Sequence, residues 1–283
     1  MTGDDRVTRR ALLGASGGAL AAPFALAGDV RADDEEDERP HRRCPEATLR
    51  PSMTSCPGSN ADGCADDDPE TERLRGAVER TIERRYPTVG ALLDAGFVPY
   101  FDTLVSGESG GYSHWLHPEF VGDDTVLDPG RPEAVLVDDE RWRPIGAMFV
   151  ATRSGERVER PPDVYRGEAE DGGRCSPWHA HAGLPGRFAW WYYRQVYEDA
   201  ASEGEVLPDC RTPCMLHVWT VSHPEGTYAH DVPPPEYRGG PDAEPAGFET
   251  AADPGTDVLG WDALPDDAVP DETPAELFAE WAR

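Results

Sequence analysis

The chain has 283 residues, of which 55 are acidic and 26 basic, so its formal net charge is −29; every basic residue is arginine. A surface this acidic repels a phosphate backbone, which excludes nucleic acid as a partner. At molar salt the Debye length falls to about 3 Å and screens the self-repulsion, so the composition predicts a halophilic protein.

The first residues have the pattern of an export signal. Arg9 and Arg10 precede an apolar run of small residues, and Ala25 and Ala27 form an A-x-A cleavage signal. Glycine and proline interrupt the run, which makes it a poor membrane-spanning helix. We therefore expect residues 1–27 to be a twin-arginine (Tat) signal peptide of the haloarchaeal type. The Tat export machinery would be a partner, and the mature chain would have no transmembrane segment and be secreted or at the cell surface. An uncleaved N-terminal anchor is the alternative.

Acidic and proline-rich segments flank the part of the chain with normal apolar content. Residues 28–68 include the acidic run 33–38 and are expected to be disordered. Residues 233–283 form a Pro/acid-rich tail with a short terminal helix over 273–281, where a capping box begins. The folded domain is expected at 69–232.

Within the domain, apolar periodicity predicts helices before strands. Amphipathic spacing indicates helices at 70–85 and 88–95. Four apolar runs indicate strands, at 134–137, 145–152, 178–182 and 215–222. The segment 188–201 fits either a helix or an inserted loop. The sequence thus predicts an α+β fold with N-terminal helices packed on a small antiparallel sheet and disordered acidic N- and C-terminal segments.

The histidines are the candidates for chemistry. His179 and His181 stand two apart in a predicted strand, so their side chains point to the same face. His217 from a neighbouring strand would complete a three-nitrogen site for Zn, Cu or Fe, with His114 as a fourth ligand or an orienting partner. Two other interpretations stay open: buried histidines that bond to backbone carbonyls, and proton transfer without a metal.

Four segments resemble, in the same order, the motifs of a family of uncharacterised secreted bacterial and archaeal proteins. These are ALLDAGF at 91–97 (family AL-x-x-AGY), GYSHWLHP at 111–118 (GYHYVNP), RPEAVLV with IGAMF within 131–149 (RPEALLY and LVGVMY), and LHVW with PEGTYA within 216–229 (LHVW and NPNGMFA). The resemblance implies that His114 and His217 are shared positions, whereas His117 replaces the usual Asn. WHAH at 178–181 is similar to the WHVH of some members. The family has no established activity, so the resemblance implies a site and no reaction.

Export into an oxidising exterior favours disulfides among the six cysteines. Cys175 paired with Cys210 or Cys214 would hold the strand of His179 beside that of His217. The alternative is a cysteine thiolate that is itself a ligand, as in a Cys–His copper centre.

The sequence therefore predicts an exported soluble protein of unknown activity with a three-histidine transition-metal site. As an enzyme it would be a metal-assisted hydrolase or oxygenase, with Glu119 or Glu133 as base. The alternative function is an extracellular binding module with structural histidines and an aromatic ligand surface over 190–193.

Overall fold

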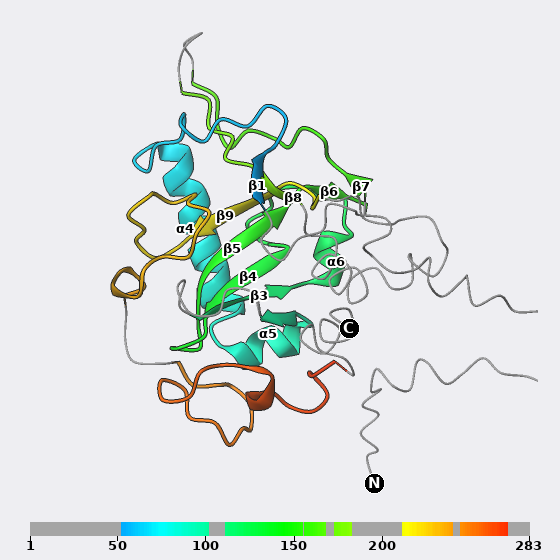
Figure 1. Cartoon of the computed structure of the whole chain (residues 1–283), viewed down its shortest axis with the longest axis vertical. Coiled ribbons are helices and arrows are strands. Elements are labelled where there is room, and N and C mark those ends of the chain that lie inside the picture. The colour runs from blue at the N-terminus through cyan, green and yellow to red at the C-terminus, as the bar shows by residue number, and fades with distance from the viewer. Residues whose placement is uncertain are drawn as a thin grey trace, which may run out of the picture. The chain divides into compact units, whose positions relative to one another are not determined.

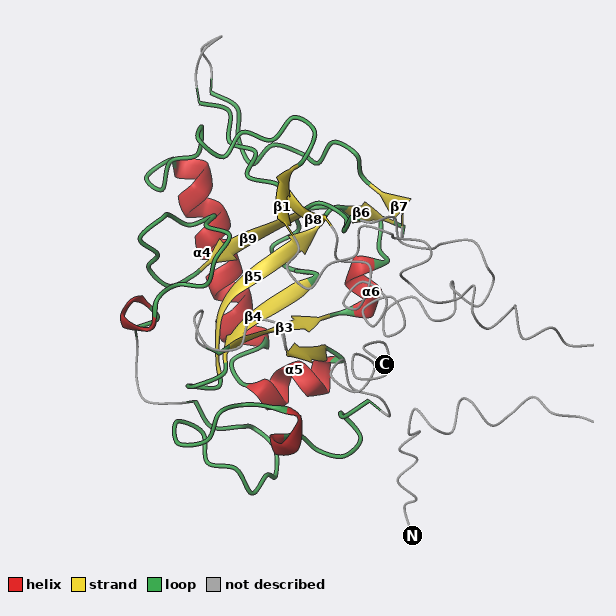
Figure 2. Cartoon of the chain, viewed as in Figure 1, coloured by secondary structure: helices red, strands yellow, loops and turns green. Residues whose placement is uncertain are grey.

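A seven-stranded antiparallel sheet is the centre of the protein, for which a computed structural model describes residues 52–101, 111–154, 156–167, 173–182, 211–239 and 244–270. All of these residues belong to one compact unit, Arg39–Arg283. The strand order is β1-β8-β9-β5-β4-β3-β2, and β6 and β7 form a separate hairpin (Figures 1 and 2). The strands are β1 (Ser52–Ser55), β2 (Val98–Phe101), β3 (Tyr112–Leu116), β4 (Ala134–Asp138), β5 (Arg143–Val150), β6 (Thr152–Arg153), β7 (Glu156–Arg157), β8 (His179–Ala182) and β9 (Met215–Trp219).

The described helices have identifiable start and stop signals. In α4 (Pro69–Arg85), the Asp68 side chain accepts a hydrogen bond from the Glu70 N–H. In α5 (Val89–Ala95), Thr88 is the N-cap, and Gly96 ends the helix with a φ of 90°, a left-handed conformation that glycine adopts without strain. The remaining helical segments are α6 (Pro118–Val121) and two 3₁₀ turns, η1 (Pro235–Tyr237) and η2 (Trp261–Ala263).

Helix α4 covers one face of the sheet. Its buried Val78 and Ile82 pack in an apolar cluster with side chains of β5, β8 and β9, including Phe149, Ala180 and Leu216. All five are buried, so this face of the sheet forms part of the core.

The C-terminal segment packs against α5 and the end of β4. Leu259, Ala263 and Leu264 are buried in one cluster with Leu92, and the Trp142 indole donates to a backbone carbonyl of the same segment at 2.8 Å. The Gly90 N–H donates to the Ala246 carbonyl, an approach that a side chain at position 90 would prevent. Figure 1 shows this segment, in orange and red, beside α5.

A buried ion pair fixes the chain that follows β9. Arg238 and Asp138 are both fully buried, with Nη1 and Oδ1 3.2 Å apart. Arg238 also donates from Nε to the Pro233 carbonyl at 2.8 Å and from Nη1 to the Gly111 carbonyl at 3.3 Å. These bonds attach residues 233–238 to the end of the β4–β5 hairpin. The loop between β9 and residue 233 is therefore held at both of its ends.

The expected fold class is wrong in several respects. The sheet is large and a strand precedes the helices, so the fold is mostly β rather than helices packed on a small sheet. Residues 28–68 were expected to be disordered, yet from residue 52 they form β1 and carry two disulfide-bonded cysteines. Residues 244–270 were expected to be a tail, yet they complete the α5 core. Disulfides and strand pairing order the first segment, and the second is ordered by apolar side chains such as Leu259 and Leu264 that pack against α5. The terminal helix expected at 273–281 and the segment 188–201 lie outside the described residues.

Candidate metal centre

Five histidines gather on the face of the sheet opposite α4. They are His114 on β3, His179 and His181 on β8, His217 on β9, and His230 in the loop that follows β9. The ring centres of His114 and His217 are 5.7 Å apart although two strands separate β3 from β9. Flat strands would place these elements about 14 Å apart. The face is therefore concave, and its side chains converge.

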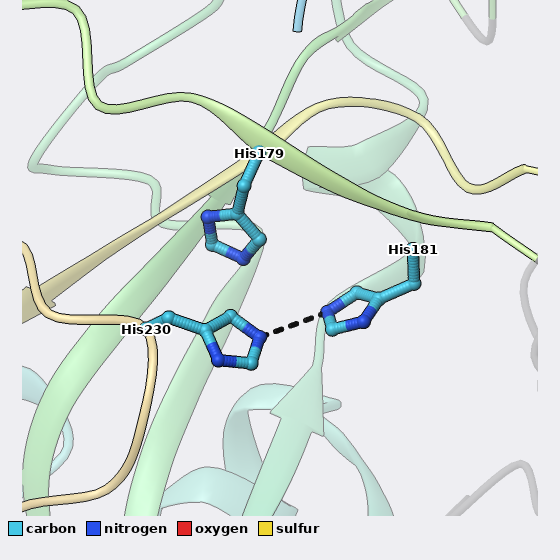
Figure 3. Close-up of side chains that lie close together, drawn as sticks. All are labelled: His179, His181 and His230. Atoms are coloured by element: carbon cyan, nitrogen blue, oxygen red, sulfur yellow. Dashed lines mark hydrogen bonds between the residues drawn. The ribbon is translucent and has the colours of Figure 1, made fainter. Parts of the chain in front are cut away.

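Three of these rings form a group that fits a metal ion. His179, His181 and His230 each offer a ring nitrogen, and the three nitrogens lie within 4.8 Å of one another. Figure 3 shows the rings facing a common space. The Nε2 atoms of His181 and His230 are 3.3 Å apart. Two nitrogens bound tetrahedrally at about 2.0–2.1 Å stand about 3.3–3.4 Å apart, so this spacing suits zinc or a metal of similar size.

Two further observations concern single rings of the group. The Nε2 of His179 is buried without a hydrogen-bond partner among the described residues. The Asp231 carboxylate accepts from His230 Nδ1 at 2.8 Å. Metal-bound histidines characteristically donate their second N–H to a carbonyl or carboxylate in this way.

The loop that carries His230 folds back along β9. The Trp219 indole donates to the Ala229 carbonyl at 2.8 Å. His223 accepts from the Glu225 N–H at 2.9 Å through Nδ1, so its Nε2–H donates to the Asp231 carbonyl at 3.1 Å. These bonds place Asp231 where its carboxylate reaches His230.

Burial keeps the strand histidines neutral. Desolvation, followed by the neighbouring His230 and His181, lowers the pKa of His179 to about 3. Desolvation and then His230 lower the pKa of His181 to about 4. Neutral imidazole is the form that binds a metal, so both rings are ready for an ion at neutral pH.

His217 lies beside the group of three. Its ring centre is 5.3 Å from that of His179, and its Nδ1–H donates to the His230 carbonyl at 2.9 Å. Its Nε2 is buried without a hydrogen-bond partner in the described part of the chain, and burial is the main cause that holds its pKa well below the usual value. The sequence-based set of His179, His181 and His217 thus differs from the group in the structure, where His230 takes the third position.

His114 is the most remote member of the face. It is in ring contact with His217 and with Tyr112, whose ring centre is 5.2 Å away, and burial lowers its pKa to about 3. His114 lies outside the group of three. The nearest histidine in the sequence, His117, has a different role. His117 stacks on Phe120 and bonds through Nε2 to the Ala95 carbonyl at 3.0 Å, which makes it a packing residue.

Neither proposed base belongs to this group. Glu133 is buried elsewhere, where its carboxylate accepts from the Val150 N–H at 3.3 Å. Burial raises its pKa to about 8, and its charged neighbours are Asp123 and Asp128 and no histidine. Glu119 lies in the first turn of α6. The carboxylate that contacts the group is Asp231.

Two disulfides hold the strands on either side of the site. Cys175, just before β8, bonds to Cys64, and Cys214, just before β9, bonds to Cys56 at the end of β1. The expected pairing of Cys175 with Cys214 or Cys210 is therefore wrong, because both partners come from the segment that was expected to be disordered. The disulfides leave neither Cys175 nor Cys214 as a thiolate ligand. Cys210 lies outside the described residues.

His230 lies within the expected folded domain at 69–232, but the sequence interpretation did not select it because no other histidine is adjacent and no predicted strand carries it. Its local signal is the adjacent Asp231, which offers a carboxylate to the imidazole.

The signal residues Arg9, Arg10, Ala25 and Ala27 and the aromatic segment 190–193 lie outside the described residues. Within the described residues, no helix has the length and apolar character that a bilayer crossing requires. Comparisons of the chain with family models, with curated proteins and with solved structures gave no match.

Proposed function

We propose that this protein is an exported metal-binding protein that holds one transition-metal ion between His179, His181 and His230. The observation that carries the proposal is the convergence of three ring nitrogens within 4.8 Å, with the His230 ring oriented by the bond from its Nδ1 to the Asp231 carboxylate. The Nε2 of His179 has no hydrogen-bond partner among the described residues, so a metal ion would not have to displace one there.

The site is suited to an ion that exchanges ligands with solvent. His179 is buried, whereas His181 and His230 are partly exposed, so the group has an inner and an outer side. Three nitrogen ligands leave a coordination position of a tetrahedral ion open to water or a small molecule. The residues His179, His181 and His230 bind and orient, and Asp231 keeps the His230 proton on Nδ1. This arrangement supports a metal carrier or a metal-assisted enzyme.

Export rests on the sequence and is compatible with the chemistry of the fold. Residues 1–27 have the features of a Tat signal, and two disulfides of the kind found in oxidising compartments staple the domain. The Tat pathway carries folded proteins, which would allow a metal to be loaded before export. Replacing Arg9 and Arg10 by lysine should leave the protein in the cytoplasm; undiminished secretion of this variant would contradict the assignment.

Binding itself is tested by titrating the purified full chain with Zn(II) against a zinc-sensitive dye. His181→Ala should remove most of the binding, because it deletes a ligand while the sheet keeps the fold. His117→Ala is the matched control, since that histidine directly follows β3 but bonds to Ala95 and packs on Phe120. Equal affinities for the two variants would refute the site.

A further inference from the structure

Methionines stand directly opposite the site histidines across the sheet. The register pairs Met53 on β1 with His181, and Met215 on β9 with His179. Directly opposed residues of antiparallel strands project to the same face, with Cβ atoms about 4.5–5.5 Å apart. Each of the two strand ligands therefore has a thioether as its cross-strand neighbour.

Three of the four methionines in the chain stand opposite a histidine. Besides Met53 and Met215, Met148 on β5 pairs with His217, and the fourth methionine is Met1. Met148 is 5% exposed and packs in an apolar cluster, so core filling explains it; Met215 is only partly buried against the edge of the same cluster. Met53 is 56% exposed on an edge strand, so packing in the core does not explain why a methionine stands there.

We propose that the site is a copper site that takes Cu(I), with the thioether of Met53 or of Met215 as the fourth ligand beside the three histidines. This inference rests on the proposed three-histidine metal site and names its ion. Thioether and imidazole are ligands that copper accepts, and thioether sulfur selects Cu(I), whereas zinc sites use thiolate, imidazole and carboxylate.

The disulfides explain why thioether would be the sulfur ligand. In the described residues Cys56, Cys64, Cys175 and Cys214 are all disulfide-bonded and cannot bind a metal as thiolates. Methionine keeps a soft sulfur in an oxidising compartment, and its three rotatable bonds let the sulfur reach an ion beside a neighbouring ring. The exposure of Met53 places it where an incoming ion would arrive first.

The test titrates the disulfide-intact full chain with Cu(I), without oxygen, against a chromophoric Cu(I) chelator, and separately with Zn(II) against a zinc dye. The variants are Met53→Leu, Met215→Leu and the double variant, with Met148→Leu as the matched control. Leucine for methionine conserves volume and is among the best-tolerated core changes. The double variant should weaken Cu(I) binding by about tenfold or more, since even groups that only support a ligand contribute about 10–100-fold. Zn(II) binding should stay unchanged, as should Cu(I) binding in the control.

X-ray absorption at the copper edge gives a second readout, in which the native protein should show sulfur as well as nitrogen scatterers and the double variant nitrogen alone. Unchanged Cu(I) affinity in the double variant, or a native spectrum without sulfur, would overturn the copper proposal and leave the three-histidine site standing. An unchanged affinity for both ions in His181→Ala would overturn the three-histidine site, and the copper proposal with it.

Discussion

Removing the Cys64–Cys175 disulfide should destabilise the domain. The expected loss depends on the Cys56–Cys214 disulfide, because the chain between Cys64 and Cys175 lies within the loop that this second bond closes. The bonds span 111 and 158 residues, and Cys64–Cys175 lies inside Cys56–Cys214. With the outer bond closed, the loop that the inner bond closes shortens to about 47 residues, the difference of the two separations. The chain-entropy relation gives about 4.8 kcal/mol for the inner loop alone and about 4 kcal/mol in the presence of the outer bond.

We expect the double variant Cys64→Ala/Cys175→Ala to lose about 4 kcal/mol of the free energy of unfolding. The measurement is urea unfolding followed by tryptophan fluorescence at high salt, extrapolated linearly to zero denaturant. The double variant Cys56→Ala/Cys214→Ala is the comparison: the loop that it opens is also about 47 residues when the inner bond is present, so a similar loss is expected. A loss below about 1 kcal/mol in the first variant would refute the reasoning, because it would show that residues 56–64 are not held in the folded domain.

Three further changes probe the site and its support. Asp231→Asn should weaken metal binding by about tenfold. This is the low end of the effect of groups that hydrogen-bond to a metal-bound histidine, because the Asp231 side chain is 78% exposed. An unchanged Kd in a dye competition would contradict this. The pKa values of His114 and His179 are held at about 3 in the fold against 6.5 in the unfolded chain, so the unfolded state takes up protons first. The free energy of unfolding should therefore fall as the pH drops from about 6.5 towards 3, and urea titrations with a chelator present that show no such fall would refute the burial of these rings. Arg238→Met should cost up to about 3–5 kcal/mol in the same assay, because it removes the buried partner of the Asp138 carboxylate and leaves only the partly exposed Arg141 beside it. A neutral effect would show that Arg238 is not needed to hold this carboxylate in the core.

The local part of the site could be predicted from the sequence. The spacing of His179 and His181 in an apolar strand determines that both rings share a face, and the structure brings these two rings together. The expected strands at 134–137 and 145–152 are β4 and β5, and the buried runs that indicate them leave little choice of secondary structure.

The rest depends on distant contacts for which single segments carry no signal. β1 has the polar sequence Ser52–Ser55, and its order comes from pairing with β8 and from the disulfide at Cys56. His230 reaches the group because its loop bonds back to β9 through Trp219. The polar composition around β1 suggests disorder, and the isolated His230 gives no sign of its ring partners, yet long-range bonds place both.

The most direct test of the account compares His230→Asn with His217→Asn in the full chain. In each variant the asparagine amide can replace the Nδ1–H bond, to Asp231 or to the His230 carbonyl, while the Nε2 atom is removed. Metal content is measured by elemental mass spectrometry after loading with copper or zinc and removal of unbound ion. The account predicts one ion per chain in the native protein and in His217→Asn, and its loss in His230→Asn. Retention of the ion in His230→Asn together with its loss in His217→Asn would contradict the account.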